Sequence, residues 1–254
     1  MTSPQSLTRS SWTVAACLWA VVCVCGPVWA FDISDPEVEK GQHKIETMHV
    51  GQSGFPAGST GNARKIQSLG YSYGLTDFWQ LKGGLIGDRL DDRDWRVGVA
   101  FVESTLEIVD IKKTGIGLAW FSAVAGAVSD DATNTVLFGP IIKFAYDRFS
   151  LTLNPFLDKS FGQNHEDGIA FVYGWQANAA IGNGVTLSLA GFGKIDDIGH
   201  APSASQQEHI IGPLVGYEFE VTDKRTKAME LGVFFGLTEA TADTAFKGKL
   251  SYSF

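Results

Sequence analysis

The chain ends on Thr244-Ala245-Phe246-Lys247-Gly248-Lys249-Leu250-Ser251-Tyr252-Ser253-Phe254, and this stretch decides the fold. Successive side chains of a β-strand point to opposite faces, so a strand with one apolar face shows large apolar residues at every second position. The stretch follows that rule up to its last residue, with apolar positions at Phe246, Leu250, Tyr252 and Phe254. It therefore predicts a final strand whose polar face carries the two lysines and whose other face ends on an aromatic ring.

Alternating aromatics up to a terminal carboxylate resemble the last strand of outer-membrane proteins, which the barrel-assembly machinery recognises. We assign Leu250, Tyr252 and Phe254 as this insertion signal. Aromatic side chains also anchor chains at membrane–water interfaces. The expected partners are thus the assembly machinery and outer-membrane lipid.

The first thirty residues have the features of a cleaved secretory signal. Arg9 supplies the positive start, Trp12–Cys25 form the apolar run, and Val28-Trp29-Ala30 supply the small-residue cleavage pattern before Phe31. The apolar run is shorter than the roughly 20 residues that a spanning helix needs. A lipoprotein signal ending at Cys17 is the alternative, but it would leave very little apolar run before the cysteine.

Removal of the signal also removes all three cysteines and one basic residue, and no acidic ones. The exported chain then contains no disulfide, and its net charge falls from −8 to −9. Phosphate binding needs a basic surface, so a nucleic-acid partner is not expected. A closed membrane barrel satisfies its backbone groups without disulfides, because every strand has two paired neighbours.

The mature chain shows short period-two segments separated by turn residues, which is the pattern of outer-membrane strands. We predict a closed antiparallel transmembrane β-barrel over 44–254, preceded by a periplasmic segment at 31–43. The predicted strands are Lys44–Val50, Ile66–Tyr73, Phe78–Ile86, Trp95–Ile108, Ile116–Ala125, Thr135–Tyr146, Phe149–Leu157, Ile169–Ala180, Val185–Ile195, His209–Phe219, Ala228–Leu237 and Thr244–Phe254.

The connections support this count of about twelve. An even number of strands places both chain ends in the periplasm, so even-numbered connections should be short and odd-numbered ones long. The sequence follows this rule, and the acidic residues gather in the long connections while the basic ones gather in the short ones. Two features remain irregular: the fourth strand changes phase, which predicts a bulge or an early end near Val102, and Pro140 and Pro155 lie inside strands.

Two stretches resemble a named family. Pro36-Glu37-Val38-Glu39-Lys40-Gly41, followed by Lys44-Ile45-Glu46, is similar to the mature start of many members, and Tyr71-Ser72-Tyr73-Gly74-Leu75-Thr76-Asp77 is similar to a strand-and-turn of the same proteins. The family is that of the outer-membrane proteins of the meta-pathway of phenol degradation. The resemblance implies a channel-like outer-membrane protein linked to uptake of aromatic or hydrophobic compounds, and it implies no catalytic residues.

The charged residues on the lumenal face are the candidate selectivity residues. A lysine facing lipid at mid-membrane depth would cost roughly 2–4 kcal/mol, so such residues should face inward. Few acids were expected at that height, which predicts a partial positive ring and a weak preference for anions. The alternative is that the charges pair across the barrel and fill it. The inward cations are Lys82, Arg96, Lys143, Lys194, Lys247 and Lys249, against Asp158, Glu218 and Glu230.

Catalysis has little support in the sequence. The five histidines are not at metal-ligand spacings, and neither a nucleophile elbow nor a phosphate-binding loop is present. A lipid-hydrolysing barrel would need a serine and a histidine on its outer face near the upper interface, and the outward faces of the clear strands were expected to contain neither.

We therefore predict a non-enzymatic channel in the cell outer membrane, without metal or cofactor, for small aromatic or carboxylated solutes. A structural or interaction barrel with a filled lumen is the alternative, and a lipid-modifying enzyme is the third hypothesis. Whether the residues after the signal enter the lumen is left open.

Overall fold

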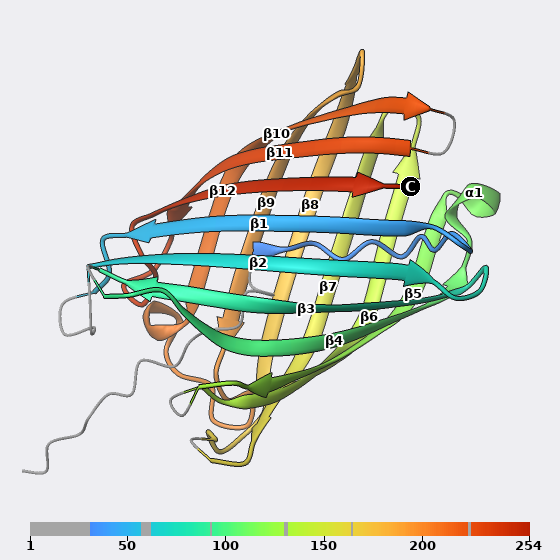
Figure 1. Ribbon diagram of the computed structural model, residues 1–254. Coiled ribbons are helices and arrows are strands. Elements are labelled where there is room, and N and C mark those ends of the chain that lie inside the picture. Colours follow the sequence, from blue (N-terminus) through green and yellow to red (C-terminus); the bar gives the residue numbers. More distant parts are fainter. Residues whose placement is uncertain (1–30, 57–61, 92, 130–131, 164, 223–224) are drawn as a thin grey trace, which may run out of the picture.

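The computed structural model describes residues 31–56, 62–91, 93–129, 132–163, 165–222 and 225–254, so the predicted signal lies outside the described residues. They form one closed antiparallel barrel of twelve strands, in which each strand pairs with its sequence neighbours and β1 pairs with β12 (Figure 1). No helix in these ranges is long and apolar enough to cross a membrane. The strands are β1 (His43–Ser53), β2 (Ala63–Gly74), β3 (Trp79–Leu90), β4 (Arg96–Val109), β5 (Ile116–Ala127), β6 (Asn134–Tyr146), β7 (Phe149–Phe161), β8 (Ala170–Gly182), β9 (Val185–Ile195), β10 (Glu208–Thr222), β11 (Arg225–Gly236) and β12 (Thr244–Ser253).

The predicted count and order of strands are confirmed, and several strands run further than predicted. β7 continues to Phe161, beyond Leu157, at which its apolar alternation stops, and β10 continues to Thr222. The hydrogen-bond ladder continues because its backbone groups still need partners once the strand leaves the apolar zone. The alternation therefore indicates where a strand lies in lipid better than where it ends.

The start of β1 and the C-terminal end of the chain meet at one rim of the barrel. There Phe254 and His43 exchange backbone hydrogen bonds of 2.8 and 2.9 Å. Single-chain outer-membrane barrels keep this rim in the periplasm, and we call it the periplasmic end. One connection at this end forms a single helical turn, α1 (Ile111–Thr114), beside the rim (Figure 1). Asp110 caps α1, and the hydrogen bond from the Lys112 N–H, with the Lys113 ammonium nearby, lowers the pKa of the Asp110 carboxyl.

The predicted lipid-facing rows do point outward. On β6, Leu137 and Ile141 are buried inside the barrel, while Phe138, Ile142 and Phe144 take the alternate, outer positions. The same alternation holds on β8, where Val172 faces inward. The outer face carries a large number of exposed apolar side chains, and such a surface requires lipid around it.

The phase change in β4 is a bulge, but it lies at Gly98 and the strand does not end there. Ile86 pairs with Val99 and Gly87 pairs with Val97, so the residue between the two partners is left over. Val97 therefore faces outward while Val99 packs against the interior. The extra residue turns Phe101 and Glu103 to the inner face, although their parity is that of the outward-facing Val97.

The two prolines lie opposite one another at an interruption in the ladder between β6 and β7. Pairing stops at Phe138 with Leu157 and resumes at Ile142 with Leu153. Proline has no N–H to donate, so a ladder can place two prolines face to face only where it is interrupted. Each proline strand remains paired on its other side, with β5 and with β8.

Candidate functional site in the barrel lumen

Residues 31–42 precede β1 and run inside the barrel, from near its middle to the periplasmic end (Figure 1). We call these residues the lumenal segment. Its first residue, Phe31, is only 6 % exposed, and Pro36 is fully buried. The periplasmic location predicted for 31–43 therefore differs from the structure: only the last residues of that range lie at the rim. The segment enters because the lumen offers partners for both its apolar and its acidic side chains.

An apolar layer surrounds the start of the segment, on the side away from the periplasm. The Phe31 ring lies 5.7 Å from the ring of Phe192 and 6.1 Å from that of Phe234 between centroids, the second contact being edge-on. Such tilted and edge-on pairs are the favoured aromatic arrangements. The buried side chains of this layer are Phe31, Met48, Val50, Ile66, Ile86, Phe101, Ala125, Ala190, Phe192, Ile210, Leu214, Phe234 and Ala245.

A layer of ion pairs lies directly below, toward the periplasm. Lys82 contacts Glu46 and lies 3.4 Å from Glu103, its direct partner across β3 and β4. Lys249 lies 2.7 Å from Asp32 of the lumenal segment and 3.6 Å from Glu46. Because Glu46 is shared by both lysines, the charges form one connected cluster. A cluster of alternating sign stabilises buried charges that could not remain alone.

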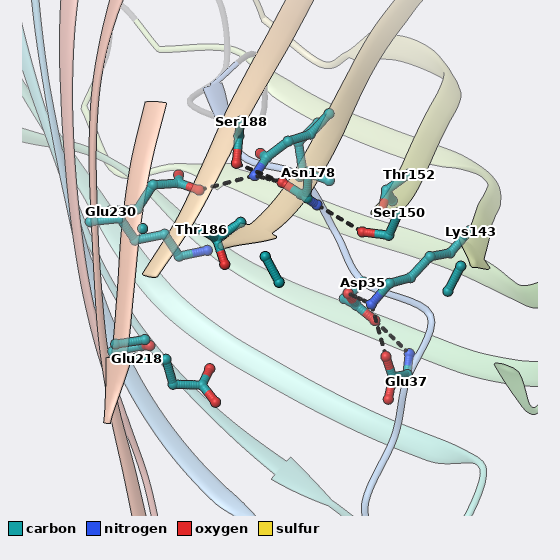
Figure 2. A pocket seen from close by; sticks show the side chains of 18 of the residues that line it. Asp35, Glu37, Lys143, Ser150, Thr152, Asn178, Thr186, Ser188, Glu218 and Glu230 are labelled. Carbon is teal, nitrogen blue, oxygen red and sulfur yellow. Dashed lines mark hydrogen bonds and ion pairs between the residues drawn. The ribbon is translucent and has the colours of Figure 1, made fainter. Parts of the chain in front are cut away.

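Two further side chains of the wall hold the middle of the lumenal segment. Asn154, buried on β7, accepts a hydrogen bond from the Ser34 N–H at 2.8 Å and donates one to the Ser34 carbonyl at 3.1 Å. Lys143 on β6 donates to Asp35 at 2.6 Å and to Glu37 at 2.8 Å. Figure 2 shows the Lys143 ammonium between the two carboxylates. The wall thus binds both the backbone and the charges of the segment.

The wall also leaves space for the lumenal segment. A side chain at Gly174 would bring its Cβ to 2.8 Å from the Ile33 methyl, and one at Gly117 would come to 2.9 Å from the Pro36 ring. Both distances are shorter than packed carbon atoms allow. The glycines at these positions of β8 and β5 therefore make the segment's path possible.

A polar cavity of about 780 Å³ occupies the periplasmic half of the lumen, beside the lumenal segment. Its wall carries a hydrogen-bond network in which Asn178 contacts Ser150 and Ser188, and Gln176 contacts Asn178 and Glu230 (Figure 2). Lys247, Lys249 and Lys143 also line this cavity. We call it the vestibule. It extends from the periplasmic end as far as the ion-pair layer, where Asp32 and Lys249 line it.

Each of the six predicted lumenal cations lies within ion-pair distance of a carboxylate. The expectation that few acids lie at the height of the lysines is wrong, because Asp32, Glu46 and Glu103 are there. The ion pairs are Lys82 with Glu103 at 3.4 Å, Arg96 with Asp88 at 3.0 Å, Lys143 with Asp35 at 2.6 Å, Lys194 with Asp196 at 2.6 Å, Lys247 with Glu230 at 2.7 Å and Lys249 with Asp32 at 2.7 Å.

The residues that the sequence analysis missed are mainly acids and glycines. Glu46 shares its parity with Met48 and Val50 on β1, which is the signal that it faces inward. Glu103 lies beside Val102, where the phase change was predicted, and a mid-strand acid of this kind indicates a lumenal cation as its partner. Asp32, Asp35 and Glu37 were placed outside the barrel, and no pattern in the sequence locates them within it.

Three strand histidines, including His43 on β1, take outer positions, and none of them lies on β6, β7 or β8, the strands with the clearest alternation. His49 lies on the outer face of β1, and His209 on that of β10. The ring of His209 contacts the Tyr173 hydroxyl at 2.7 Å through Nδ1 and the Gln207 side-chain oxygen at 3.1 Å through Nε2. Both ring nitrogens therefore have a partner, and neither partner is a serine. These two contacts join His209 to β8 and to the loop before β10. They do not include the serine that a hydrolase would hold beside its histidine.

The geometry defines a class of protein: a closed, twelve-stranded β-barrel of the outer membrane, with a lipid-facing exterior and a segment of its own chain inside. Among solved structures, the chain is similar to the COG4313 outer membrane channel from Pseudomonas putida F1, with 13 % identity, a TM-score of 0.62, and coverage of 87 % of this chain and 98 % of that one. The KdgM porin follows at 12 % identity and a TM-score of 0.53, covering 83 % and 99 %. The NanC porin has 11 % identity and a TM-score of 0.51, covering 83 % and 98 %. At these low sequence identities, the structural similarity shows a common fold alone.

The family is shown by sequence. Residues 114–254, more than half of the chain, match the family model described as "Putative MetA-pathway of phenol degradation", and the chain belongs to this family. The matched part lies after the two stretches on which the resemblance was based. No curated protein sequence matches the chain.

Proposed function

We propose that the protein is an outer-membrane channel for small solutes, and that the lumenal segment closes it. One observation carries this proposal: the vestibule ends at residues 31–38, which belong to no strand and are held by non-covalent contacts with wall side chains, whereas Gly41 and Gln42 bond to the β2 backbone. A closure of this kind can be withdrawn without breaking the barrel. The lumen has an aromatic layer above an ion-pair layer that contains Lys82 and Lys249, and this chemistry suits aromatic or carboxylated solutes.

The predicted preference for anions applies to the open channel, from which the lumenal segment has been withdrawn. The lumenal segment supplies both carboxylates that lie near Lys143 and one of the two near Lys249. Withdrawal of the segment leaves these lysines with fewer counter-charges than the closed barrel provides. Unpaired cations in a constriction attract anions and repel cations. The six lumenal cations are proposed as selectivity residues in this sense.

The filled structural barrel is the second candidate function, and the pairing of the lumenal cations favours it. The two functions differ in the effect of deleting 31–38, which leaves every strand in place. We expect the full mature chain to be nearly impermeable in planar bilayers, and the deletion variant to conduct and to pass small solutes into liposomes. A deletion variant that folds, as judged by heat-modifiable migration, and still excludes ions and solutes would support the filled barrel.

A further inference from the structure

Phe31 and Asp32 place an aromatic ring and a carboxylate side by side in the middle of the lumen. The ring belongs to the apolar layer, where it contacts Phe192 and Phe234. The carboxylate belongs to the ion-pair layer, 2.7 Å from the Lys249 ammonium and 4.0 Å from that of Lys82. The two adjacent residues thus cross the boundary between the layers, and each side chain has its own partner in the wall.

All four partners are part of the barrel wall, on β9, β11, β12 and β3. They stay in place when the lumenal segment withdraws, and they then form an empty site. Apolar cavities bind apolar molecules that fit them, since an unfilled apolar space loses its packing contacts. An ammonium that has lost a carboxylate at 2.7 Å likewise favours another anion.

We propose that Phe31 and Asp32 act as an internal substitute for a ligand, and that their site binds an aromatic carboxylate. This inference rests on the proposed channel function and assigns its solute class and its subsite. The solute places its ring on Phe192 and Phe234 and its carboxylate on Lys249. The solute and the Phe31 and Asp32 side chains then exclude one another, so arrival of the solute displaces this end of the lumenal segment and favours its release.

The surroundings of Asp32 favour a monocarboxylate over a neutral or cationic molecule. Lys249 keeps a second acid, Glu46, at 3.6 Å, so one negative charge restores the balance that Asp32 provides. A cation placed where the Asp32 carboxylate lies would instead meet the Lys249 ammonium, which Asp32 contacts at 2.7 Å. A small cavity of about 30 Å³ adjoins Asp32 and is lined by Phe101, Phe121 and Phe156 among others. A ligand larger than the Phe31 and Asp32 side chains would extend into that space.

Competition with the attached segment sets the expected affinities. A tethered group acts at an effective concentration on the order of millimolar for a short link. A free solute therefore binds weakly while Phe31 and Asp32 occupy the site, and more tightly once both side chains are removed. The remaining contacts of the segment, at Asn154 and Lys143, keep the rest of the chain in place.

The experiment uses the Phe31→Ala/Asp32→Ala variant of the full chain, purified folded from outer membranes. Calorimetric titration compares 3-phenylpropanoate with 3-phenylpropanamide, which has the same ring and no charge. We expect the variant to bind the acid at least tenfold more tightly than the unmodified protein does, and at least tenfold more tightly than it binds the amide. Adding Lys249→Met should remove the preference for the acid. Equal affinities for acid and amide, or an unchanged preference in Lys249→Met, would overturn the proposal.

Lys159→Gln is the matched control. Lys159 lies near the Phe161 end of β7, away from the proposed site, and it donates to the carbonyls of Glu166 and Gly168. It should leave the acid preference unchanged, and loss of the preference in this control would remove the support from Lys249→Met. If the Lys249→Met protein does not fold, Ser34→Cys in the otherwise unmodified chain gives a second test. The acid, and not the amide, should speed its labelling by a maleimide as the segment is released, and equal labelling rates would contradict competition.

Failure of this site and failure of the channel are distinguishable. If the barrel lacking 31–38 passes solutes while the double variant binds no aromatic acid, the site assignment is wrong and the channel function stands. If that deleted barrel is folded and impermeable, the channel function itself is wrong.

Discussion

Lys143→Met should release the lumenal segment, because Lys143 forms two short charge-assisted hydrogen bonds to it, at 2.6 and 2.8 Å. Hydrogen bonds to charged groups contribute about 1.5–3 kcal/mol each when well shielded, and exposed ion pairs about 0.2–1 kcal/mol. The Lys143 side chain is 15 % exposed, but those of Asp35 and Glu37 are 50 % and 39 % exposed. We therefore assign about 1 kcal/mol to each bond. A total of about 2 kcal/mol corresponds to a roughly 30-fold shift in the docking equilibrium.

The absence of cysteine after residue 30 makes this shift measurable. Ser34→Cys introduces a single thiol at a position whose backbone is held by Asn154, and a membrane-impermeant maleimide labels it only when the segment is released. Lys143→Met in this background should raise the labelling rate roughly 10- to 30-fold. Added salt should raise the rate in the parent protein and have less effect in Lys143→Met, since partly exposed ion pairs are screened.

The matched control is Lys112→Met. The Lys112 side chain is 75 % exposed and lies 4.0 Å from Glu37, at the distance limit of an ion pair. Its removal should change the labelling rate by less than about twofold. An equal, slow rate in Lys143→Met and in the parent would refute the reasoning, because the two hydrogen bonds would then contribute nothing to docking.

Three further outcomes are expected. Phe254→Ala should reduce the amount of heat-modifiable folded barrel while export continues, since the terminal aromatic is both a recognition element and an interface anchor; normal amounts of folded barrel would contradict this. Lys247→Met should cost about 1–3 kcal/mol, because it removes the ion pair at 2.7 Å from Glu230, whose side chain is 22 % exposed and keeps its hydrogen bond from Gln176; a urea midpoint equal to that of the parent would show that the pair is not structural. Mass analysis should find the mature chain beginning at Phe31, and a lipid-modified Cys17 would instead support the lipoprotein alternative.

The sequence determined the barrel because lipid imposes a simple rule on every strand. Each side chain of a strand faces either hydrocarbon or lumen, so every position has one of two environments. The alternation from Phe138 to Phe144, or along β12, therefore shows the face of each residue without any knowledge of its contacts. The same rule placed Lys82, Lys143, Lys247 and Lys249 in the interior. It also required an even number of strands, which fixed the short and long connections.

Only the tertiary structure decided what the interior contains. The partners of Lys249 lie 217 residues away at Asp32 and on β1 at Glu46, and the alternation carries no information about contacts across the barrel. Residues 31–42 form no strand, so the periodicity is silent on them, and their place depends on space left by glycines on β5 and β8. The apolar alternation that lipid imposes on the strands is enough to predict the barrel wall. Whether the space within it is open or occupied depends on side chains brought together by closure of the barrel.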